Sequence, residues 1–528
     1  MNDDVSKSKL NANLKGENNI FFTILKGIII VLLIALQIFE FFVVYNATKH
    51  IYNYAAFTFF TIKLCIVLYI LYRHSSPEYK LSWIVFITFL PIAGIVVYLL
   101  WGNSELRKKK EKSLNNIEKQ SQRYLENSNV EQQILNFDKS RYLEAKYITN
   151  VTGYPCYQNQ EMQYFGSGEE LFGNLKEDLK NANQYILMEF FLISEGKLWK
   201  EILEILKQKL SKGVKVTIIT DSFGSLQRRP KHFVADMQKL GIDIVLFNPF
   251  TTFTNGYFNY RDHRKIVVID GVIAYTCGMN LADEYANIIE RYGHWKDSGV
   301  KIVGKAALNY TIMILRTLQS CKKEPIDFKW YKDVRDICVN AVNSPVHGFL
   351  VTYSDGPNNK KDPIENMYVK MINNAEDYVY ITTPYLILDE TILNALLSSV
   401  RSGVDVKIIL PHIPDKKIVN IVTKSYYQVL LEAGVKVYEY APGFIHSKNM
   451  VSDDCCASIG SANMDFRSLH INFEAGVWTY KTGIEFDIKK DFENTLKESI
   501  EINYNDWKNR NIFLKIIEAI LSAFAPMM

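Results

Sequence analysis

The pattern His-x-Lys-x4-Asp occurs twice in this chain of 528 residues, and in both copies an Asn follows seventeen positions after the His. The two copies are His263, Lys265, Asp270 and Asn280, and His446, Lys448, Asp453 and Asn463. Two such sets suit a two-step phosphodiester transfer, in which one His attacks phosphorus, the other protonates the leaving alcohol, and Lys and Asn hold the anionic oxygens. One copy alone is equally well explained by a structural His on a strand, since nine His give about a few chance matches per hundred chains. The repeat is therefore what predicts catalysis.

The residues around each motif indicate how its side chains are positioned. Alternation along a strand puts the His and Lys of one copy on the same face, two residues apart. The Asn must return to that face through a turn, for which Gly271 and Gly460 are suitable. Because Lys and Asn supply charge stabilisation, we expect no metal ion, and no carboxylate cluster of metal-ligand type accompanies either motif.

Each His also needs an acidic partner. A nucleophilic His must be neutral and an acid His protonated, and two His near one anion can split their pKa values as a coupled pair. A carboxylate beside each ring fixes its tautomer. Asp297 and Glu474 follow their motifs at comparable positions and are the candidates, with ordinary strand-end carboxylates as the equally weighted alternative.

The chain around the motifs alternates helical patterns with short Val- and Ile-rich runs, which is typical of a parallel or mixed sheet built from βα units. The first half places strands at 185–193, 213–220, 241–247 and 265–270. The second half repeats this order at 378–383, 403–410, 434–440 and in KNMVS after His446. We predict an α/β fold of two homologous lobes, 146–330 and 345–510, each a mixed sheet flanked by helices. A pseudo-twofold axis would bring both motifs to one cleft.

The first hundred residues are of a different kind. Apolar runs at 27–45, 54–72 and 81–101 are each long enough to cross a hydrocarbon core as a helix. The first two runs contain ionisable residues, so two transmembrane helices are the alternative to three. We predict a membrane anchor over 1–102 and a charged helical linker over 103–145.

Charge and thiols bear on compartment and partners. The basic cluster at 107–112 tips the charge balance slightly toward a cytoplasmic catalytic body. Seven Cys without CxxC or CxxH spacing fit a reducing compartment better than a disulfide framework or a structural zinc site. The net charge of +4 is small for this length and gives no case for nucleic-acid binding.

The C-terminal segment, 511–528, has an amphipathic pattern. Its apolar helical face lies opposite Lys515, Glu518 and Ser522 and consists of Ile512, Phe513, Ile516, Ile517, Ile520, Leu521 and Phe524. A helix that packs on the catalytic body and an interfacial membrane helix fit this pattern equally well.

The paired motifs resemble the phospholipase D superfamily, and the chain is similar in particular to bacterial cardiolipin synthases. The resemblance is carried along nearly the whole chain by PEYKLSWIVFITFLPIAGIVVYLLWG, FNPF at 247–250, HRKIVVIDG, GMNLADEY, ITTPYLILDE, SYYQVLLEAGVKVYEYAPGFIHSK and GSANMDFRSLHINFE. It implies two phospholipase D-like lobes behind transmembrane helices, in a multi-pass protein of the bacterial plasma membrane.

The resemblance also implies a reaction: two phosphatidylglycerol molecules give cardiolipin and glycerol, with neither metal nor nucleotide cofactor. By carry-over, His263 is the nucleophile that forms a phosphohistidine, and His446 is the acid that releases glycerol and then activates the incoming hydroxyl. The residues implied to grip the phosphate are Lys265, Lys448, Asn280, Ser461 and Asn463. Asp270 and Asp453 complete the candidate catalytic set, although the superfamily implies a mainly structural role for them.

Two departures from the family pattern occur in the first motif. Cys277-Gly278 stands where the family often has Gly-Gly, so a thiol lies near the predicted site. Gly278 also stands where the second copy has Ser461, so the lobes need not grip phosphate equally.

Several alternatives stay open. Another phosphatidyltransferase or a hydrolytic phospholipase D would share the motifs, because water and a lipid hydroxyl can resolve the same intermediate. A membrane-tethered nuclease fits less well, and a non-catalytic scaffold least. The expected partners are phosphatidylglycerol and other membrane lipids, and the sequence leaves open whether the chain forms a homo-oligomer.

Overall fold

The computed structural model describes residues 52–527, apart from 74, 103–105, 107, 127–128, 227, 230–231, 250–259 and 340–347. The chain divides into two compact units, Met1–Asn103 and Ser104–Met528. The apolar run predicted as a helix over 27–45 lies outside the described residues.

The described part of the N-terminal unit contains α2 (Tyr52–Tyr72), α3 (Pro77–Phe89) and α4 (Pro91–Trp101). The helix predicted over 54–72 corresponds to α2. The single helix predicted over 81–101 is wrong, because the backbone leaves the helical region at Leu90, with φ of −127° and ψ of 74°. Pro91 explains this break, since proline disfavours helical backbone at the preceding residue. Across the described ranges, no single helix combines the length and the hydrophobicity that crossing a bilayer requires.

The first lobe is built on a seven-stranded mixed sheet, ordered β2-β9-β7-β6-β3-β4-β5. Its strands are β2 (Glu161–Phe165), β3 (Tyr185–Phe190), β4 (Lys215–Asp221), β5 (Asp243–Phe247), β6 (Lys265–Ile269), β7 (Ile273–Cys277) and β9 (Gly299–Val303). Its helices are α7 (Gly168–Asn181), α8 (Lys197–Ser211), α9 (Phe233–Lys239), α10 (Ala307–Cys321) and α11 (Phe328–Val339), with the short η4 (Asp283–Ala286). The strands β3, β4 and β5 are parallel, and β6 runs antiparallel to β3.

The second lobe is built on a nine-stranded sheet, ordered β1-β10-β19-β17-β16-β11-β13-β14-β20. Its strands are β1 (Cys156–Gln158), β10 (Phe349–Asp355), β11 (Tyr378–Thr382), β13 (Asp405–Pro411), β14 (Lys436–Tyr440), β16 (Asn449–Ser452), β17 (Cys456–Gly460), β19 (Glu474–Tyr480) and β20 (Ser499–Glu501). Its helices are α12 (Pro363–Asn373), α13 (Glu390–Arg401), α14 (Lys417–Ser425), α15 (Tyr427–Ala433), α16 (Phe466–His470), α17 (Ile484–Lys497), α18 (Tyr504–Lys508) and α19 (Ile512–Ser522), followed by η5 (Ala525–Met527). A pair of two-residue strands, β12 (Leu386–Ile387) and β18 (Met464–Asp465), completes it.

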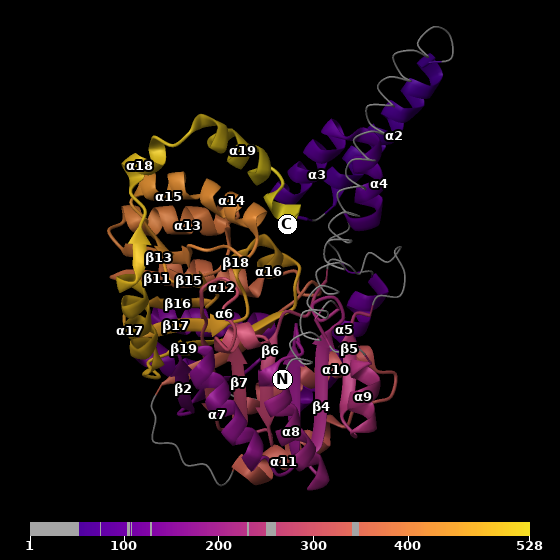
Figure 1. Ribbon diagram of the computed structural model, residues 1–528, viewed down its shortest axis with the longest axis vertical. Helices are drawn as coiled ribbons and strands as arrows, with labels where there is room; N and C mark the ends of the chain where they lie inside the picture. Colours follow the sequence, from indigo (N-terminus) through magenta and orange to yellow (C-terminus); the bar gives the residue numbers. More distant parts are fainter. Residues whose placement is uncertain are drawn as a thin grey trace, which may run out of the picture. The chain divides into compact units, whose positions relative to one another are not determined.

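The two sheets repeat one topology. The order β9-β7-β6-β3-β4-β5 of the first matches β19-β17-β16-β11-β13-β14 of the second, with the same directions at the central strands. All eight predicted strands are present in this arrangement, so the predicted mixed α/β fold with an internal repeat is confirmed. In Figure 1 the second lobe, in orange and yellow, lies above the first, in magenta.

The segment between the N-terminal unit and the first sheet is less regular than the predicted helical linker. It contains α5 (Lys108–Ser121), η1 (Gln122–Tyr124), η2 (Val130–Asn136) and α6 (Lys139–Thr152). Side chains of η2, α6 and β1 belong to the hydrophobic core of the second lobe, among them Ile134, Ile148 and Cys156. In space, the first lobe therefore begins at β2 rather than near residue 146.

The lobes are joined by strand pairing across their boundary. β8 (His294–Lys296) of the first lobe pairs in parallel with β15 (Gly443–Ile445) of the second. A parallel bridge between Asp262 and Phe473 makes the equivalent link on the other side of the repeat. Both links lie directly beside a motif His.

Candidate active site

A cleft of about 540 Å³ lies where the two lobes meet. Its walls include His263 and Asn280 from the first motif and His446 and Asn463 from the second. The structure thus brings together four of the residues singled out by spacing alone, from positions up to 200 residues apart in the chain.

Each motif His is bound by a carboxylate from the opposite lobe. Nδ1 of His263 lies 2.9 Å from Oε1 of Glu474, and Nδ1 of His446 lies 2.7 Å from Oδ2 of Asp297. A carboxylate accepts, so each Nδ1 carries the proton and each Nε2 is left with a lone pair for the cleft. Both acids predicted from the sequence therefore bind the imidazoles. The acids are exchanged between the lobes, since the acid that follows each motif binds the His of the other motif, which the sequence did not indicate.

The exchange follows from the strand pairing between lobes. The backbone N–H of His263 donates to the carbonyl of Phe473 at 2.9 Å, which places Glu474 beside the ring. The N–H of His446 donates in the same way to the carbonyl of Lys296 at 2.6 Å, which places Asp297. Each half of the cleft is complete only when the other lobe is docked.

Burial favours the neutral form of both imidazoles. Burial lowers the pKa of His263, and Glu474 offsets this only in part. The pKa of His446 falls well below its usual value through burial and through repulsion from Lys448 and Lys265. Both rings therefore begin as uncharged groups with a free Nε2.

The two acids differ in their charge state. Burial raises the pKa of Asp297 to about 6. Burial acts on Glu474 too, but His263, Lys265 and the Ser461 hydroxyl together hold the pKa of this carboxyl below its usual value. Glu474 is thus the more firmly ionised of the pair.

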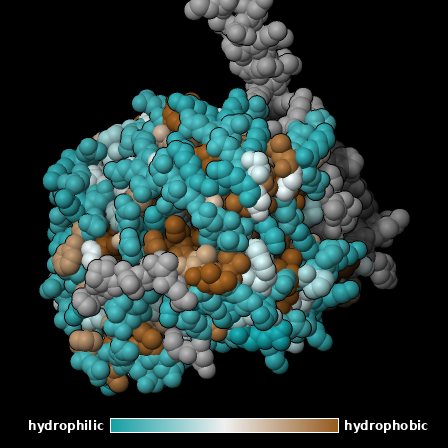
Figure 2. Space-filling model, turned by 90° about the horizontal axis from the view of Figure 1, so that it is seen from below, coloured by the Kyte–Doolittle hydropathy of each residue, from teal (hydrophilic) through white to brown (hydrophobic). Residues whose placement is uncertain are grey.

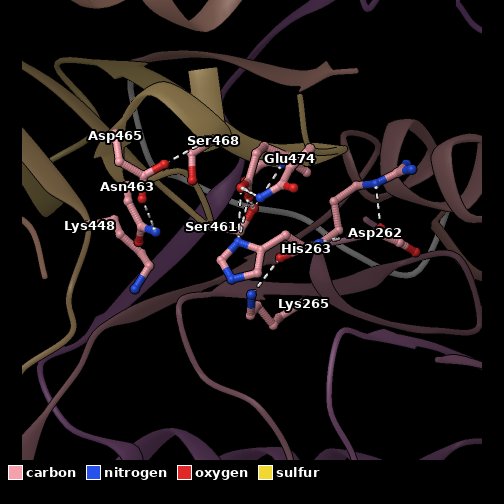
Figure 3. A network of polar contacts seen from close by, with 12 residues as sticks. Asp262, His263, Lys265, Lys448, Ser461, Asn463, Asp465, Ser468 and Glu474 are labelled. Atoms are coloured by element: carbon pink, nitrogen blue, oxygen red, sulfur yellow. Dashed lines mark hydrogen bonds and ion pairs between the residues drawn. The ribbon is translucent and has the colours of Figure 1, made fainter. Parts of the chain in front are cut away.

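Both motif lysines are buried, and the positive charge of Lys448 acts on the ammonium group of Lys265. The amino group of Lys265 donates to the carbonyl of His263 at 2.5 Å, and that of Lys448 donates to the carbonyl of His446. Burial lowers the pKa of Lys265 to about 7 and that of Lys448 to about 8. Figure 3 shows His263 with Lys265 below its ring, Lys448 and Asn463 to one side and Glu474 above. This arrangement is an anion site, because a phosphate would stabilise both ammonium groups.

The amides and the hydroxyl predicted to grip phosphate have different surroundings. Asn280 accepts from the N–H of Leu192 at 3.1 Å and donates to the hydroxyl of Tyr285 at 2.8 Å. Asn463 donates to Asp465 at 2.9 Å, and its buried Oδ1 has no hydrogen-bond partner. Ser461 donates to Oε2 of Glu474 at 2.5 Å and accepts from the N–H of Ala475 at 3.0 Å. The Ser461 hydroxyl is therefore engaged with the acid that holds His263.

Asp270 and Asp453 lie at the far ends of their strands from the histidines, and neither lines the cleft. Asp270 accepts from the backbone N–H groups of residues 183–185 at 2.7 to 2.8 Å. Asp453 accepts from those of 376–378 at 3.0 to 3.2 Å, and from Arg141 at 2.7 Å. This geometry does not support their place among the catalytic residues. Both carboxylates instead bind backbone N–H groups at the start of a central strand, β3 for Asp270 and β11 for Asp453.

The turn after each motif is also built differently from the prediction. Gly271 has φ of +69° and turns the first motif as expected. Gly460 is the last residue of β17, and the second turn is made by Asp453 and Asp454, with φ of 54° and 56°. Gly460 instead permits close strand packing, since a Cβ there would lie 2.4 Å from the carbonyl oxygen of Ala475.

Comparison with known proteins identifies the family. A model described as "Cardiolipin synthase, PLD-like domain" matches residues 175–290 and 368–496, and one described as "Phospholipase D-nuclease N-terminal" matches 62–103. A cardiolipin synthase of Halalkalibacterium halodurans is 31% identical over 466 residues, which make up 88% of this chain and 91% of that protein. The chain belongs to the cardiolipin synthase family.

Two further similarities extend over most of the chain. A Streptococcus mutans protein is 37% identical over 470 residues, covering 88% of this chain and 99% of that protein. The crystal structure of a phosphatidylserine synthase from Haemophilus influenzae matches 73% of this chain and 98% of its own, with a TM-score of 0.55 at 15% identity. This chain therefore shares its fold with that protein.

The family departures in the first motif can now be placed. Cys277 is buried in the core, its Sγ directed to the carbonyl of Met279 at 3.6 Å, and burial raises its pKa to about 12, so the thiol is inert. A Cβ on Gly278 would lie 2.4 Å from Oδ1 of Asp297. Glycine at this position gives Asp297 the space to reach His446.

Aromatic contacts to the histidines were missed from the sequence. The ring of Phe191 meets His263 edge-on at 5.2 Å, while Tyr285, Trp295 and Phe444 surround His446 at 5.2 to 5.7 Å. Trp295 lies two residues before Asp297 in HWKD, so its position beside the candidate acid was the available signal. These rings pack around the two imidazoles and fix their positions at the cleft.

Asp362, Glu365 and His470 form the group in the described part of the chain whose spacing would suit a metal ion. The ring of His470 lies 3.2 Å from Asp362 and 3.4 Å from Asp389, and these acids raise its pKa to about 10 against the effect of burial. In this arrangement the imidazolium of His470 forms ion pairs with these acids.

Proposed function

We propose that this chain is a cardiolipin synthase, which transfers a phosphatidyl group from one phosphatidylglycerol to another and releases glycerol. Family membership makes it a phosphatidyltransferase of the phospholipase D type. The observation that carries the mechanism is the pair of imidazoles at one cleft, each with Nδ1 tied to a carboxylate and Nε2 left for chemistry.

In the first step, Nε2 of His263 attacks phosphorus of a bound phosphatidylglycerol. The P–N bond forms as the P–O bond to glycerol breaks, and the glycerol oxygen takes a proton from His446. His446 can carry that proton once substrate is bound, because the phosphate anion offsets the repulsion from Lys448 and Lys265 that lowers the pKa of this ring.

In the second step, a hydroxyl of another phosphatidylglycerol gives its proton to His446 while its oxygen attacks phosphorus. The new P–O bond forms, the P–N bond breaks, and His263 returns to its starting state. Lys265 and Lys448 stabilise the charge on the equatorial oxygens in both steps, and Asn280 and Asn463 orient the phosphate.

The assignment of roles is supported by the acids. Glu474 is held ionised beside His263, which increases the basicity of Nε2 and suits a nucleophile. Burial and repulsion from Lys448 and Lys265 lower the pKa of His446, and aromatic rings enclose it, which suits a group that is protonated only when an anion is present.

Family membership also makes the chain a membrane-associated enzyme. We propose further that residues 1–102 anchor it in the plasma membrane as a multi-pass segment, with the two lobes of the catalytic body on the cytoplasmic side. The match of residues 62–103 to the N-terminal family model supports the anchor, as do strongly exposed apolar side chains such as Phe57, Tyr72 and Phe89.

The test uses the purified full-length chain with phosphatidylglycerol vesicles, a chelator and no nucleotide. We expect cardiolipin and free glycerol in equal amounts, and none from a matched His263→Ala preparation. Phosphatidic acid with glycerol and no cardiolipin would assign the chain to hydrolysis instead. Pulse labelling of the substrate phosphate should trap a phosphoenzyme that is labile in acid and stable in base, as a phosphohistidine is. An acid-stable phosphoenzyme would indicate a nucleophile other than histidine.

A further inference from the structure

The C-terminal helix α19 presents the reverse of the usual amphipathic arrangement. Glu518 is its buried residue, 8% exposed, and is paired with Arg510 at 2.8 and 3.0 Å. Lys515 turns back to donate to the carbonyl of Lys508 at 2.5 Å. The exposed apolar side chains, 45 to 71% accessible, are Ile512, Phe513, Leu514, Ile516, Ile517 and Ile520. The polar side of the helix therefore faces the body, and the apolar side faces outward.

This orientation favours the interfacial helix over the other alternative left by the sequence. A helix that packs on the body would bury its apolar stripe, because that burial is what stabilises a surface helix in water. Here the body holds the helix by an ion pair instead, and six large apolar side chains have no protein cover among the described residues of this unit. A contiguous exposed patch of this kind marks an interaction site.

The exposed face continues to the mouth of the active-site cleft. α19 packs on α14, and Lys416 and Val419 at the start of α14 line the cleft. The chain after α19 returns through η5, where Ala525 lines the cleft and the segment contacts α16. A surface bound by α19 would therefore lie at the entrance through which a lipid must pass.

The charges beside this face suit an anionic lipid surface. Lys416, Lys417 and Lys508 are exposed around α14 and α19, and the ammonium of Lys416 lies 4.8 Å from the ring centre of Tyr385. Ile418, which follows Lys417 in the chain and is 57% exposed, adds a further apolar side chain next to the lysines. Lysines interleaved with large apolar residues are the composition of helices that lie at the headgroup boundary.

We propose that α19, with the start of α14, inserts into the surface of an anionic bilayer and seats the cleft at the headgroups. This inference rests on the proposed function, since it takes the substrate to be a membrane phospholipid. The helix has eleven residues and is about 16 Å long at 1.5 Å per residue. It is too short to cross a hydrocarbon core of about 30 Å, so it lies in the plane of the interface. The opposite end of the catalytic body, seen from below in Figure 2, is mainly hydrophilic, with brown side chains in small groups.

The test places a fluorescent reporter on the apolar face. Phe513→Trp is prepared in the full-length chain, and its emission is compared with that of the parent on phosphatidylglycerol vesicles whose acyl chains are brominated near the headgroup. We expect the added emission to fall at least twofold with brominated lipid and to be shielded from aqueous acrylamide. Phe486→Trp is the matched control: Phe486 is 59% exposed on α17, and its reporter should respond to acrylamide alone.

The other occupants of the face give distinct results. A reporter shielded from both quenchers is covered by protein, either a second copy or another part of the chain, and overturns the inference. A reporter quenched only by acrylamide overturns it as well. Quenching needs no turnover, so we expect it in His263→Ala as well. In the chain with His263 intact, lipid quenching without cardiolipin synthesis would sink the proposed function alone, and synthesis without lipid quenching would sink the docking alone.

A second measurement connects docking to catalysis. Ile516→Glu/Ile520→Glu places two charges on the exposed face, where folding does not require apolar residues. We expect the vesicle concentration for half-maximal rate to rise about tenfold, and the loss to shrink in mixed detergent micelles that bring substrate to the cleft without a bilayer. An equal loss in micelles and vesicles would contradict a docking role, and Phe486→Glu should leave both rates unchanged.

Discussion

The two halves of the cleft present the same motif on the same strand order, yet they hold their histidines with different acids. His263 is bound by Glu474, which Ser461 supports at 2.5 Å. His446 is bound by Asp297, and the position equivalent to Ser461 is Gly278. The longer acid is paired with a hydroxyl that restrains it, and the shorter acid with a glycine that lets it approach.

This difference shows how a repeated lobe can supply two chemical roles. Both acids are fully buried, but burial raises the pKa of Asp297 to about 6, while hydrogen bonds and nearby cations lower that of Glu474. A permanent anion beside one ring favours nucleophilic attack, and a weaker anion beside the other favours a proton that comes and goes. The asymmetry resides in the supporting residues, since the motifs themselves are the same.

The largest effect is expected from removing the rings. His263→Ala and His446→Ala should each lower the rate of cardiolipin formation by at least about a thousandfold, because nucleophilic and general-acid catalysis are both lost. A phosphatidyl ester of p-nitrophenol separates the two roles, since its leaving group needs no proton. With this substrate His446→Ala should still release p-nitrophenol and His263→Ala should not.

Two outcomes would break the comparison. Full activity in either variant would refute a paired mechanism, and p-nitrophenol release by His263→Ala alone would reverse the roles. His412→Ala is the control, because His412 is half-exposed and bound to Glu439 outside the motifs, and it should retain normal turnover.

A smaller effect, on the order of a hundredfold, is expected from neutralising the acids. Glu474→Gln and Asp297→Asn keep the side-chain shape but can present an amide N–H to Nδ1, which favours the wrong tautomer. Glu474→Gln should slow formation of the phosphoenzyme even with the p-nitrophenyl ester, whereas Asp297→Asn should be largely rescued by it. Equal rescue of both variants would mean that each acid serves both rings.

The residues that support the two acids should give unequal losses of rate, about tenfold for Gly278→Ala and about threefold for Ser461→Ala. Gly278→Ala places a Cβ against Asp297 Oδ1, where the backbone offers little freedom to shift, and should displace the partner of His446. Ser461→Ala removes one hydrogen bond from Glu474, which keeps its contact with His263. Steady-state rates with phosphatidylglycerol test the order, and a greater loss in Ser461→Ala would place this hydroxyl on the phosphate instead.

Sequence was sufficient for the repeated strands and for the residues that meet in the cleft, because each depends on local pattern and on one spacing. The break at Leu90 was also available, since Pro91 stands in the middle of the apolar run. The exchange of acids between the lobes could not be predicted, because it depends on how the two sheets dock. That docking is made by the pairing of β8 with β15 and of Asp262 with Phe473. The same holds for β1, whose three residues join the second sheet after a chain path that no periodicity reveals.

The smallest effect on turnover is expected from replacing Asp270 and Asp453. At these two equivalent positions the lobes are compared by the free energy of unfolding. Each carboxylate binds three successive backbone N–H groups at the start of a central strand, from a residue with positive φ. Alanine would leave these donors without their acceptor and would strain the turn, at a cost of about 2–3 kcal/mol in the free energy of unfolding. Asn tolerates positive φ and keeps one oxygen, so Asp270→Asn should recover much of this loss.

Asp453 should be the more costly of the two, because it also accepts from Arg141, whose side chain is 3% exposed. When Asp453 is lost, this guanidinium keeps its ion pair with Glu144 and a hydrogen bond to the Ser452 hydroxyl. We expect Asp453→Ala to unfold with about 1 kcal/mol less stability than Asp270→Ala in the detergent-solubilised chain. Replacing Arg141 with Met in the Asp453→Ala background should return part of that difference, since it removes the poorly compensated charge. A hundredfold loss of turnover in either variant at unchanged stability would restore the carboxylates to the catalytic set, whereas a loss that tracks unfolding supports their place at the strand ends.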